Sequence, residues 1–310
     1  MIRAELKRVL WFQKGILIIL IMCAAVALYY YIKNESKITE EQYQQLSEFY
    51  IEFEGEITEE KRDAINKGFE QYYGKPCDEA YLYQNVKNNI EDKTYLVYDY
   101  GWNSLISFGY PDYPLWVAVI ILGTLIFAYD AGHKVQNIHN TSYNGRRKLV
   151  LSRTIVWCLI SLVLVLVNGL TEFLMAKMFV GLRCFDGPIQ AALAFTDCTM
   201  NITLLEGVLL ANLIKFIGVV MIGLFMGVMA TLIRNMYITI IASTVVTFEK
   251  YFLSALFDKP YLMPLRLLMP YQAINTNNVA KVIAVGLIII VLLLAGIIII
   301  NNEKSRRRLV

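Results

Sequence analysis

Long apolar runs without charge constrain this chain more than any other feature. Five runs of 17 to 21 residues contain no Asp, Glu, Lys or Arg, and they cover residues 15–32, 113–129, 154–171, 216–233 and 282–302. A further apolar segment, 235–257, is interrupted only by Glu249-Lys250. A helix needs about 20 mostly apolar residues to cross a bilayer. The sequence therefore predicts an all-α polytopic protein of the cell membrane, with six transmembrane helices.

Composition excludes the other common classes of protein. The chain is 57% hydrophobic and 18% charged, whereas soluble domains are roughly 45–50% apolar and about 25% charged. The same values exclude an intrinsically disordered chain. A net charge of +3 over 310 residues gives no basic surface for a nucleic acid, so we expect no nucleic-acid partner.

The distribution of charge sets the orientation. If the N-terminus is cytoplasmic, the inside segments are 1–14, 130–153, 231–235 and 301–310, which together carry 14 basic and 3 acidic residues. Segment 33–113 then lies outside, with 8 basic and 17 acidic residues. Because Lys and Arg are enriched in cytoplasmic loops, both termini are expected to be cytoplasmic.

The first apolar run also has features of a signal peptide. Basic residues precede it, and it contains Ala25-Val26-Ala27, which is typical of a cleavage site. However, the run continues through Tyr29-Tyr30-Tyr31, and such aromatic residues suit a membrane interface. We therefore favour an uncleaved first unit, 1–32, made of a cytoplasmic helix and the first span.

Residues 33–113 are expected to form a small extracellular α or α+β domain. Thr39 and Thr58 each precede acidic residues and can cap a helix, and 94–98 reads as a strand. Aromatic and apolar residues recur at helical spacing at Tyr43, Leu46, Tyr50 and Phe53. Two interpretations stay open: these side chains form the core of the domain, or they contact a ligand such as a cationic peptide.

No enzyme motif is present. The two histidines, His133 and His139, are too far apart for a zinc-protease helix, and neither a nucleophile elbow nor a phosphate-binding loop occurs. We therefore expect no catalytic residue, no metal site and no cofactor bound by this chain. An uncharacterised intramembrane enzyme remains a minor alternative. Cys184 and Cys198 share an outside loop and can form a disulfide, although spacing does not establish one.

The loop between the second and third spans, 130–153, is the most informative segment. An acidic residue ends the second span, a short amphipathic stretch follows, Asn144-Gly145 predicts a turn, and a basic cluster begins the next helix. In its simplest interpretation this cluster only anchors the loop on the cytoplasmic face.

The order of these features resembles the bacterial ABC-2 family of ABC transporter permeases. The matching positions are Asp130 (where the family usually has Glu), Gly132, Thr141, Ser142, Arg146 and Arg153 (where Lys is usual). The basic amphipathic start of the chain resembles the family's cytoplasmic elbow helix. The outside segment 258–280, with Pro260, Pro264 and Pro270, resembles its re-entrant hairpin. Within 114–310 the likeness extends over all five remaining spans, whereas 33–113 looks like an insertion.

The resemblance implies a transmembrane permease subunit of an exporter for a peptide, lipid or other amphiphile. Such a subunit pairs with a second permease copy or paralogue and with cytoplasmic ATP-binding cassette subunits, which would hold ATP and Mg. Asp130, Arg146, Arg147 and Lys148 are the residues expected to couple it to these ATPases. The alternative is a membrane-anchored sensor or immunity scaffold, whose extracellular domain binds a ligand.

Two charges lie inside predicted spans. Glu172 is near the outer end of the third span and Lys215 is near that of the fourth, so the two side chains are expected at similar depth. They are expected either to form a structural ion pair or to line a polar substrate path.

Overall fold

The structure is a computed structural model, and it is mostly helical. It describes residues 1–35, 49, 51–72, 83, 95–97, 101–102, 105, 112–129, 145–192, 195, 198–233, 235–247, 270–275 and 277–306. The principal elements are α1 (Ile2–Lys7), η1 (Arg8–Phe12), α2 (Gly15–Glu35), β1 (Gly55–Glu56), α4 (Glu59–Tyr72), β2 (Tyr95–Leu96), α7 (Tyr113–Phe127), α10 (Gly145–Phe179), η3 (Ile189–Ala191), α11 (Leu204–Ile233), α12 (Met236–Thr247), α15 (Pro270–Asn275) and α16 (Val279–Arg306).

Four of these helices, α2, α10, α11 and α16, are long and apolar enough to cross a membrane, which suggests a multi-pass membrane protein. The other two predicted spans are represented by shorter apolar helices. α7 has 15 residues and the described part of α12 has 12, or about 22 and 18 Å at 1.5 Å per residue. By length, the described residues thus provide four of the six expected spans.

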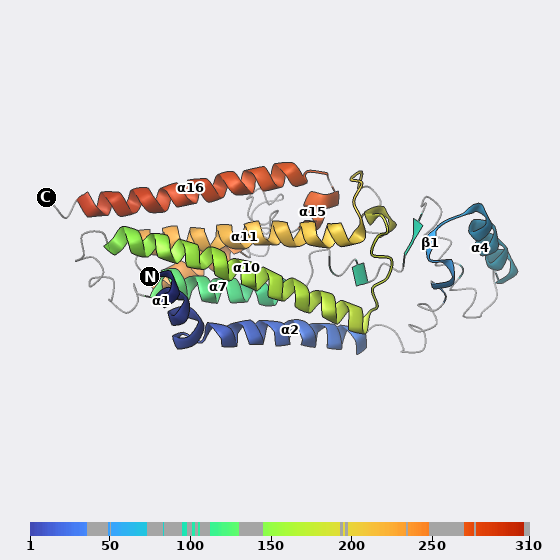
Figure 1. Cartoon of the computed structure of the whole chain (residues 1–310), viewed down its shortest axis with the longest axis horizontal. Helices are drawn as coiled ribbons and strands as arrows, with labels where there is room; N and C mark the ends of the chain where they lie inside the picture. The colour runs from blue at the N-terminus through green and yellow to red at the C-terminus, as the bar shows by residue number, and fades with distance from the viewer. Residues whose placement is uncertain are drawn as a thin grey trace.

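The long helices lie side by side, and α11 is central among them (Figure 1). It contacts α7, α10, α12, α15 and α16, whereas α2 packs against α7 and α10. The N-terminus and the end of α16 lie at the same end of the bundle, and α4 and β1 lie beyond the opposite end (Figure 1). We call these the terminal end and the lobe end of the bundle.

Two apolar layers form the interior of the bundle. The layer nearer the lobe end includes Val26, Ala176, Val208 and Ile274. The layer nearer the terminal end includes Met22, Leu122, Trp157 and Val219. Each layer joins α2, α10 and α11, so these helices are held together by apolar packing at two levels.

The chain begins with a short amphipathic segment, α1 and η1, which packs on the bundle. α1 contacts α10, and η1 contacts α2 and α7. Val9 is fully buried in the apolar layer at the terminal end. The segment turns into α2 at Lys14, whose φ of 57° lies in the left-handed region. At Gly15 a Cβ would lie 2.7 Å from the Val9 carbonyl oxygen, so only glycine permits this approach.

The small lobe has a core of its own. β1 and β2 pair antiparallel, and Phe53, Ile65 and Leu96 are buried together. The helix expected after Thr58 is α4, and the Thr58 Oγ1 accepts a hydrogen bond from the Lys61 N–H at 3.3 Å. Within the predicted strand 94–98, Tyr95–Leu96 forms β2. The helix expected after Thr39, with Tyr43, Leu46 and Tyr50, lies outside the described residues.

Trp102 ties the segment before α7 to the lobe end of the bundle. Its indole N–H donates to the Arg183 carbonyl at 2.9 Å, and its ring packs edge-on against Phe185. Trp102 is fully buried in the apolar layer at this end. The chain between β2 and α7 therefore returns into the bundle before α7 begins.

Candidate functional site

Three charged side chains from three helices meet inside the bundle. Asp112 is the N-cap residue of α7, Glu172 lies on α10, and Lys215 lies on α11. α7 is much shorter than α2, α10 and α11 and begins well inside the bundle (Figure 1). Because α7 begins at this level, its N-cap residue Asp112 lies at the same depth as Glu172 and Lys215.

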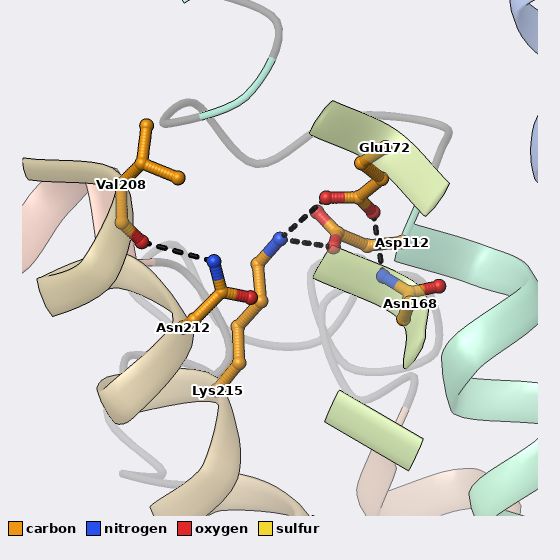
Figure 2. Close-up of polar contacts among 6 residues, drawn as sticks. All are labelled: Asp112, Asn168, Glu172, Val208, Asn212 and Lys215. Atoms are coloured by element: carbon orange, nitrogen blue, oxygen red, sulfur yellow. Dashed lines mark hydrogen bonds and ion pairs between the residues drawn. The ribbon is translucent and has the colours of Figure 1, made fainter. Parts of the chain in front are cut away.

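The ammonium group of Lys215 bridges the two carboxylates. Its Nζ lies 2.6 Å from the Asp112 Oδ1 and 3.3 Å from the Glu172 Oε2 (Figure 2). The Asn168 Nδ2 donates to the other Glu172 oxygen, Oε1, at 2.6 Å. Asn168 precedes Glu172 by one helical turn on α10, so the Asn168 amide holds the Glu172 carboxylate in place from the same helix.

A second amide lies beside the cluster on α11. The Asn212 Nδ2 donates to the Val208 carbonyl at 3.0 Å (Figure 2). On the facing helix, a Cβ at Gly169 would lie 2.5 Å from the Asn212 Oδ1. Gly169 thus allows α10 and α11 to approach closely at the level of the charges. Among the described residues, Oδ1 of Asn168 and Oδ1 of Asn212 are buried without a hydrogen-bond partner.

The cluster is removed from solvent. The side chains of Asp112, Glu172 and Lys215 are only 2 to 3% exposed. Burying a charge costs several kcal/mol unless it is paired, which explains why the three charges lie together. The cluster lies between Val165 and Ala176 along α10, which belong to different apolar layers.

Known proteins give no guide to this arrangement. No protein-family model matches the chain, and neither the curated proteins nor the solved structures contain a significant match.

Lys215 makes two unequal contacts within the cluster. With all three groups ionised, two negative charges face one positive charge. Asp112 keeps the shorter contact to Lys215, and Glu172 makes the longer one. Charge-assisted hydrogen bonds are stronger when shorter. If α10 moved relative to α11, the Glu172 contact would be lost first, and Lys215 would stay paired with Asp112.

The two intramembrane charges expected at similar depth are thus in contact. Asp112 was not expected there, because counting residues from the end of an uncharged run assigned it to the outside segment. Asn168 was also missed, although its one-turn spacing from Glu172 is a signal that the sequence carries.

The residues expected to couple the chain to ATPases are only partly described. Asp130, Gly132, Thr141 and Ser142 lie outside the described residues. Arg146, Arg147 and Lys148 lie in the first turn of α10, with the Lys148 side chain exposed. Arg153 lies further along α10, and it is 5% exposed and buried in the bundle. The re-entrant segment 258–280 is described only from Pro270, where α15 begins.

The structure does not join the two cysteines for which a disulfide was considered possible. Cys184 and Cys198 are both free thiols. The Cys198 Sγ lies 3.5 Å from the Ile274 carbonyl and 3.7 Å from the Asn277 Oδ1, whereas Cys184 hydrogen-bonds with Tyr95 and Glu54. The two thiols face different elements, which is why their spacing in one loop does not lead to a bond. Burial, followed by the Glu54 carboxylate, raises the pKa of Cys184.

No metal centre is found in the described part of the chain, which contains no group of three or more His, Cys, Asp or Glu side chains able to hold a metal ion. The only charged cluster that we assign there as a candidate functional site is the Asp112–Glu172–Lys215 triad.

Proposed function

We propose that the chain is a six-span transmembrane subunit of an exporter of the ABC-2 type. It would move a peptide, lipid or other amphiphile across the cell membrane, driven by separate cytoplasmic ATPase subunits. α7 and α12 are the two additional spans in this proposal, and the terminal end of the bundle is cytoplasmic. The lobe of α4, β1 and β2 then lies outside the cell.

One observation carries the proposal: α10 is a single helix that runs from the basic loop to the buried cluster. It begins at Gly145, within the loop 130–153 proposed to contact the ATPases, and reaches Glu172 without interruption. At 1.5 Å per residue this is about 40 Å. A push on the loop would therefore be transmitted along one rigid element to the Glu172–Lys215 contact.

The N-terminal segment of the chain also packs against α10. The amphipathic segment α1 contacts α10, and its residues Arg3 and Lys7 add positive charge at the terminal end. An excess of Lys and Arg on one face of a membrane protein is typical of the cytoplasmic side. This supports the placement of loop 130–153 where a cytoplasmic ATPase can reach it.

The mechanism follows from the two unequal contacts of Lys215. Closure of the ATPase subunits around ATP would shift α10 and separate Glu172 from Lys215, while Asp112 keeps the ammonium paired. This would open the space between α10 and α11 toward the lobe end. ATP hydrolysis stays on the partner, and this chain converts its motion.

The experiment is affinity purification in mild detergent, followed by identification of the copurifying subunits. We expect an ATP-binding cassette subunit with the wild-type chain, and we expect Arg146→Glu with Arg147→Glu to lose it. The control is Lys67→Glu with Lys177→Glu, which makes the same charge change at exposed positions away from the loop. Retention of the ATPase by the loop variant would refute the coupling assignment, and capture of a histidine kinase instead would favour a sensor.

A further inference from the structure

The first twelve residues form a shallow basic pocket on the outside of the bundle. The pocket measures about 300 Å³ and is lined by Arg3, Leu6, Lys7, Leu10 and Trp11. It has two cations, two aliphatic side chains and one indole, and no acidic residue lines it. This combination fits a ligand with one anionic group and an apolar body.

The structure separates the cations of this segment into two kinds. Arg8 forms an ion pair with Glu5 at 2.7 Å, and both side chains are partly buried. Arg3 and Lys7, by contrast, are exposed and lie at the pocket. Arg3 and Lys7 thus give the pocket two positive charges, while the neighbouring acid, Glu5, is paired with Arg8.

The backbone turns the aromatic residues away from the bundle. Arg8–Phe12 forms a π-helical turn, closed by the Gln13 N–H to the Arg8 carbonyl at 2.9 Å. In this turn Val9 is fully buried, while Trp11 is 70% and Phe12 is 76% exposed. Large exposed aromatic residues beside exposed cations are typical of a helix lying in the membrane interface.

We propose that this pocket binds the headgroup of an anionic phospholipid. The phosphate would accept hydrogen bonds from Arg3 and Lys7, and the acyl chains would extend past Leu6, Leu10 and Trp11. Arg suits a phosphate because its planar group donates two parallel hydrogen bonds. This inference requires the chain to lie in a membrane, but it does not depend on a partner ATPase.

The lipid would lie beside the helix that carries the buried charges. α1 contacts α10, and η1 contacts α2 and α7. A lipid held at Arg3 and Lys7 would therefore stabilise the packing of this segment on three helices of the bundle. The composition of the membrane would influence the stability of the bundle through this contact.

The test uses the full chain in nanodiscs or detergent, with phosphatidylglycerol and phosphatidylcholine as the probes. Lipid binding is measured by native mass spectrometry. We expect the wild-type chain to prefer phosphatidylglycerol, and we expect Arg3→Gln with Lys7→Gln to weaken its binding about tenfold, since each cation contributes near an anionic surface. Arg3→Lys with Lys7→Arg should keep the preference and shows that the segment is still folded.

The matched control is Lys67→Gln with Lys177→Gln, which removes the same charge from exposed positions elsewhere. The control should bind phosphatidylglycerol like the wild type. An unchanged preference in the Arg3 and Lys7 double Gln variant would overturn the proposal, as would an equal loss in the control. Displacement of the lipid by an equal concentration of inorganic phosphate would also overturn it, because it would show a site for free anions.

Discussion

The Lys215 Nζ lies 2.6 Å from the Asp112 Oδ1, although α11 and the start of α7 are far apart in the sequence. The same ammonium is 3.3 Å from the Glu172 Oε2 on α10. One side chain therefore connects three helices at a buried level of the bundle. We therefore expect the stability of the bundle to depend on this connection.

Removing the ammonium should destabilise the bundle strongly. Lys215→Met keeps the length of the side chain but leaves two buried carboxylates without their shared partner. Breaking a buried pair in this way typically costs about 3–5 kcal/mol. We expect a marked fall in the thermal unfolding midpoint in detergent, whereas the control Lys177→Met, at an exposed position of α10, should stay close to the wild type. Equal midpoints for the two variants would contradict the role assigned to Lys215.

The two carboxylates should not be equivalent. Glu172→Gln keeps the shorter Asp112–Lys215 contact and leaves one charge of each sign, so its cost should be the smaller. Asp112→Asn removes the partner at 2.6 Å and leaves Lys215 with the longer contact. We expect the unfolding midpoint to fall further for Asp112→Asn than for Glu172→Gln. The reverse order would show that the longer contact dominates.

The sequence predicted the four long apolar helices, but their ends less accurately. Uncharged runs marked α2, α10, α11 and α16, but α10 extends beyond its run in both directions. The uncharged run is bounded by Arg153 on one side and Glu172 on the other, whereas α10 continues past both residues. Arg153 and Glu172 both lie within α10 and are buried. The Glu172 carboxylate is stabilised there by its contacts with Lys215 and Asn168.

The third member of the cluster could not be found by the same counting. Glu172 and Lys215 were placed at similar depth by their distance from the helix ends. Asp112 belongs to segment 33–113, which the sequence assigns to the outside, and its depth is set by how far inside the bundle α7 begins. That is a property of the packing of α7 against α2, α10 and α11. The thiol partners of Cys184 and Cys198 depend on tertiary packing in the same way.

Close approach of α10 and α11 should require glycine at two levels. At Gly223 a Cβ would overlap the indole of Trp157, whose Nε1 donates to the Val220 carbonyl at 3.3 Å. We expect Gly223→Ala to cost about 1–3 kcal/mol, because added volume in a packed interior forces its neighbours to move. Gly296→Ala is the matched control, since the nearest atom to its Cβ would be 4.0 Å away. Comparable melting curves for the two variants would rule out this packing.

Gly169→Ala, at the level of the charge cluster, should destabilise the bundle, and a second substitution should relieve this loss of stability. The added Cβ would meet the Asn212 Oδ1 at 2.5 Å, so Asn212→Ala removes the atom that it meets. We expect the double variant to be more stable than the summed destabilisation of the two single variants predicts, because the effects of substitutions at residues in contact are not additive. A double-mutant cycle of unfolding midpoints measures this, and additive effects would count against the contact.

Cys184 should react slowly as a free thiol. Burial and the Glu54 carboxylate raise its pKa above the ordinary value for a cysteine, so less thiolate is present at neutral pH and alkylation should accelerate only at higher pH. The measurement is the rate of maleimide labelling of a variant that keeps only Cys184, followed over pH. Without any reductant, mass spectrometry should find no Cys184–Cys198 bond, and detection of that bond in the native chain would contradict the structure.

The central claim is that ATP-driven motion at the basic loop reaches the charge cluster through α10. It is tested by a distance measurement between spin labels at Met178→Cys on α10 and Leu209→Cys on α11, both exposed positions near the lobe end, in the complex purified with its ATPase. All native cysteines are replaced by serine for this purpose. We expect the distance distribution of the complex to shift when non-hydrolysable ATP is added. The same labelled chain carrying Arg146→Glu and Arg147→Glu, which is expected to purify without the ATPase, should show no shift. An unchanged distribution in a complex that hydrolyses ATP would contradict the central claim.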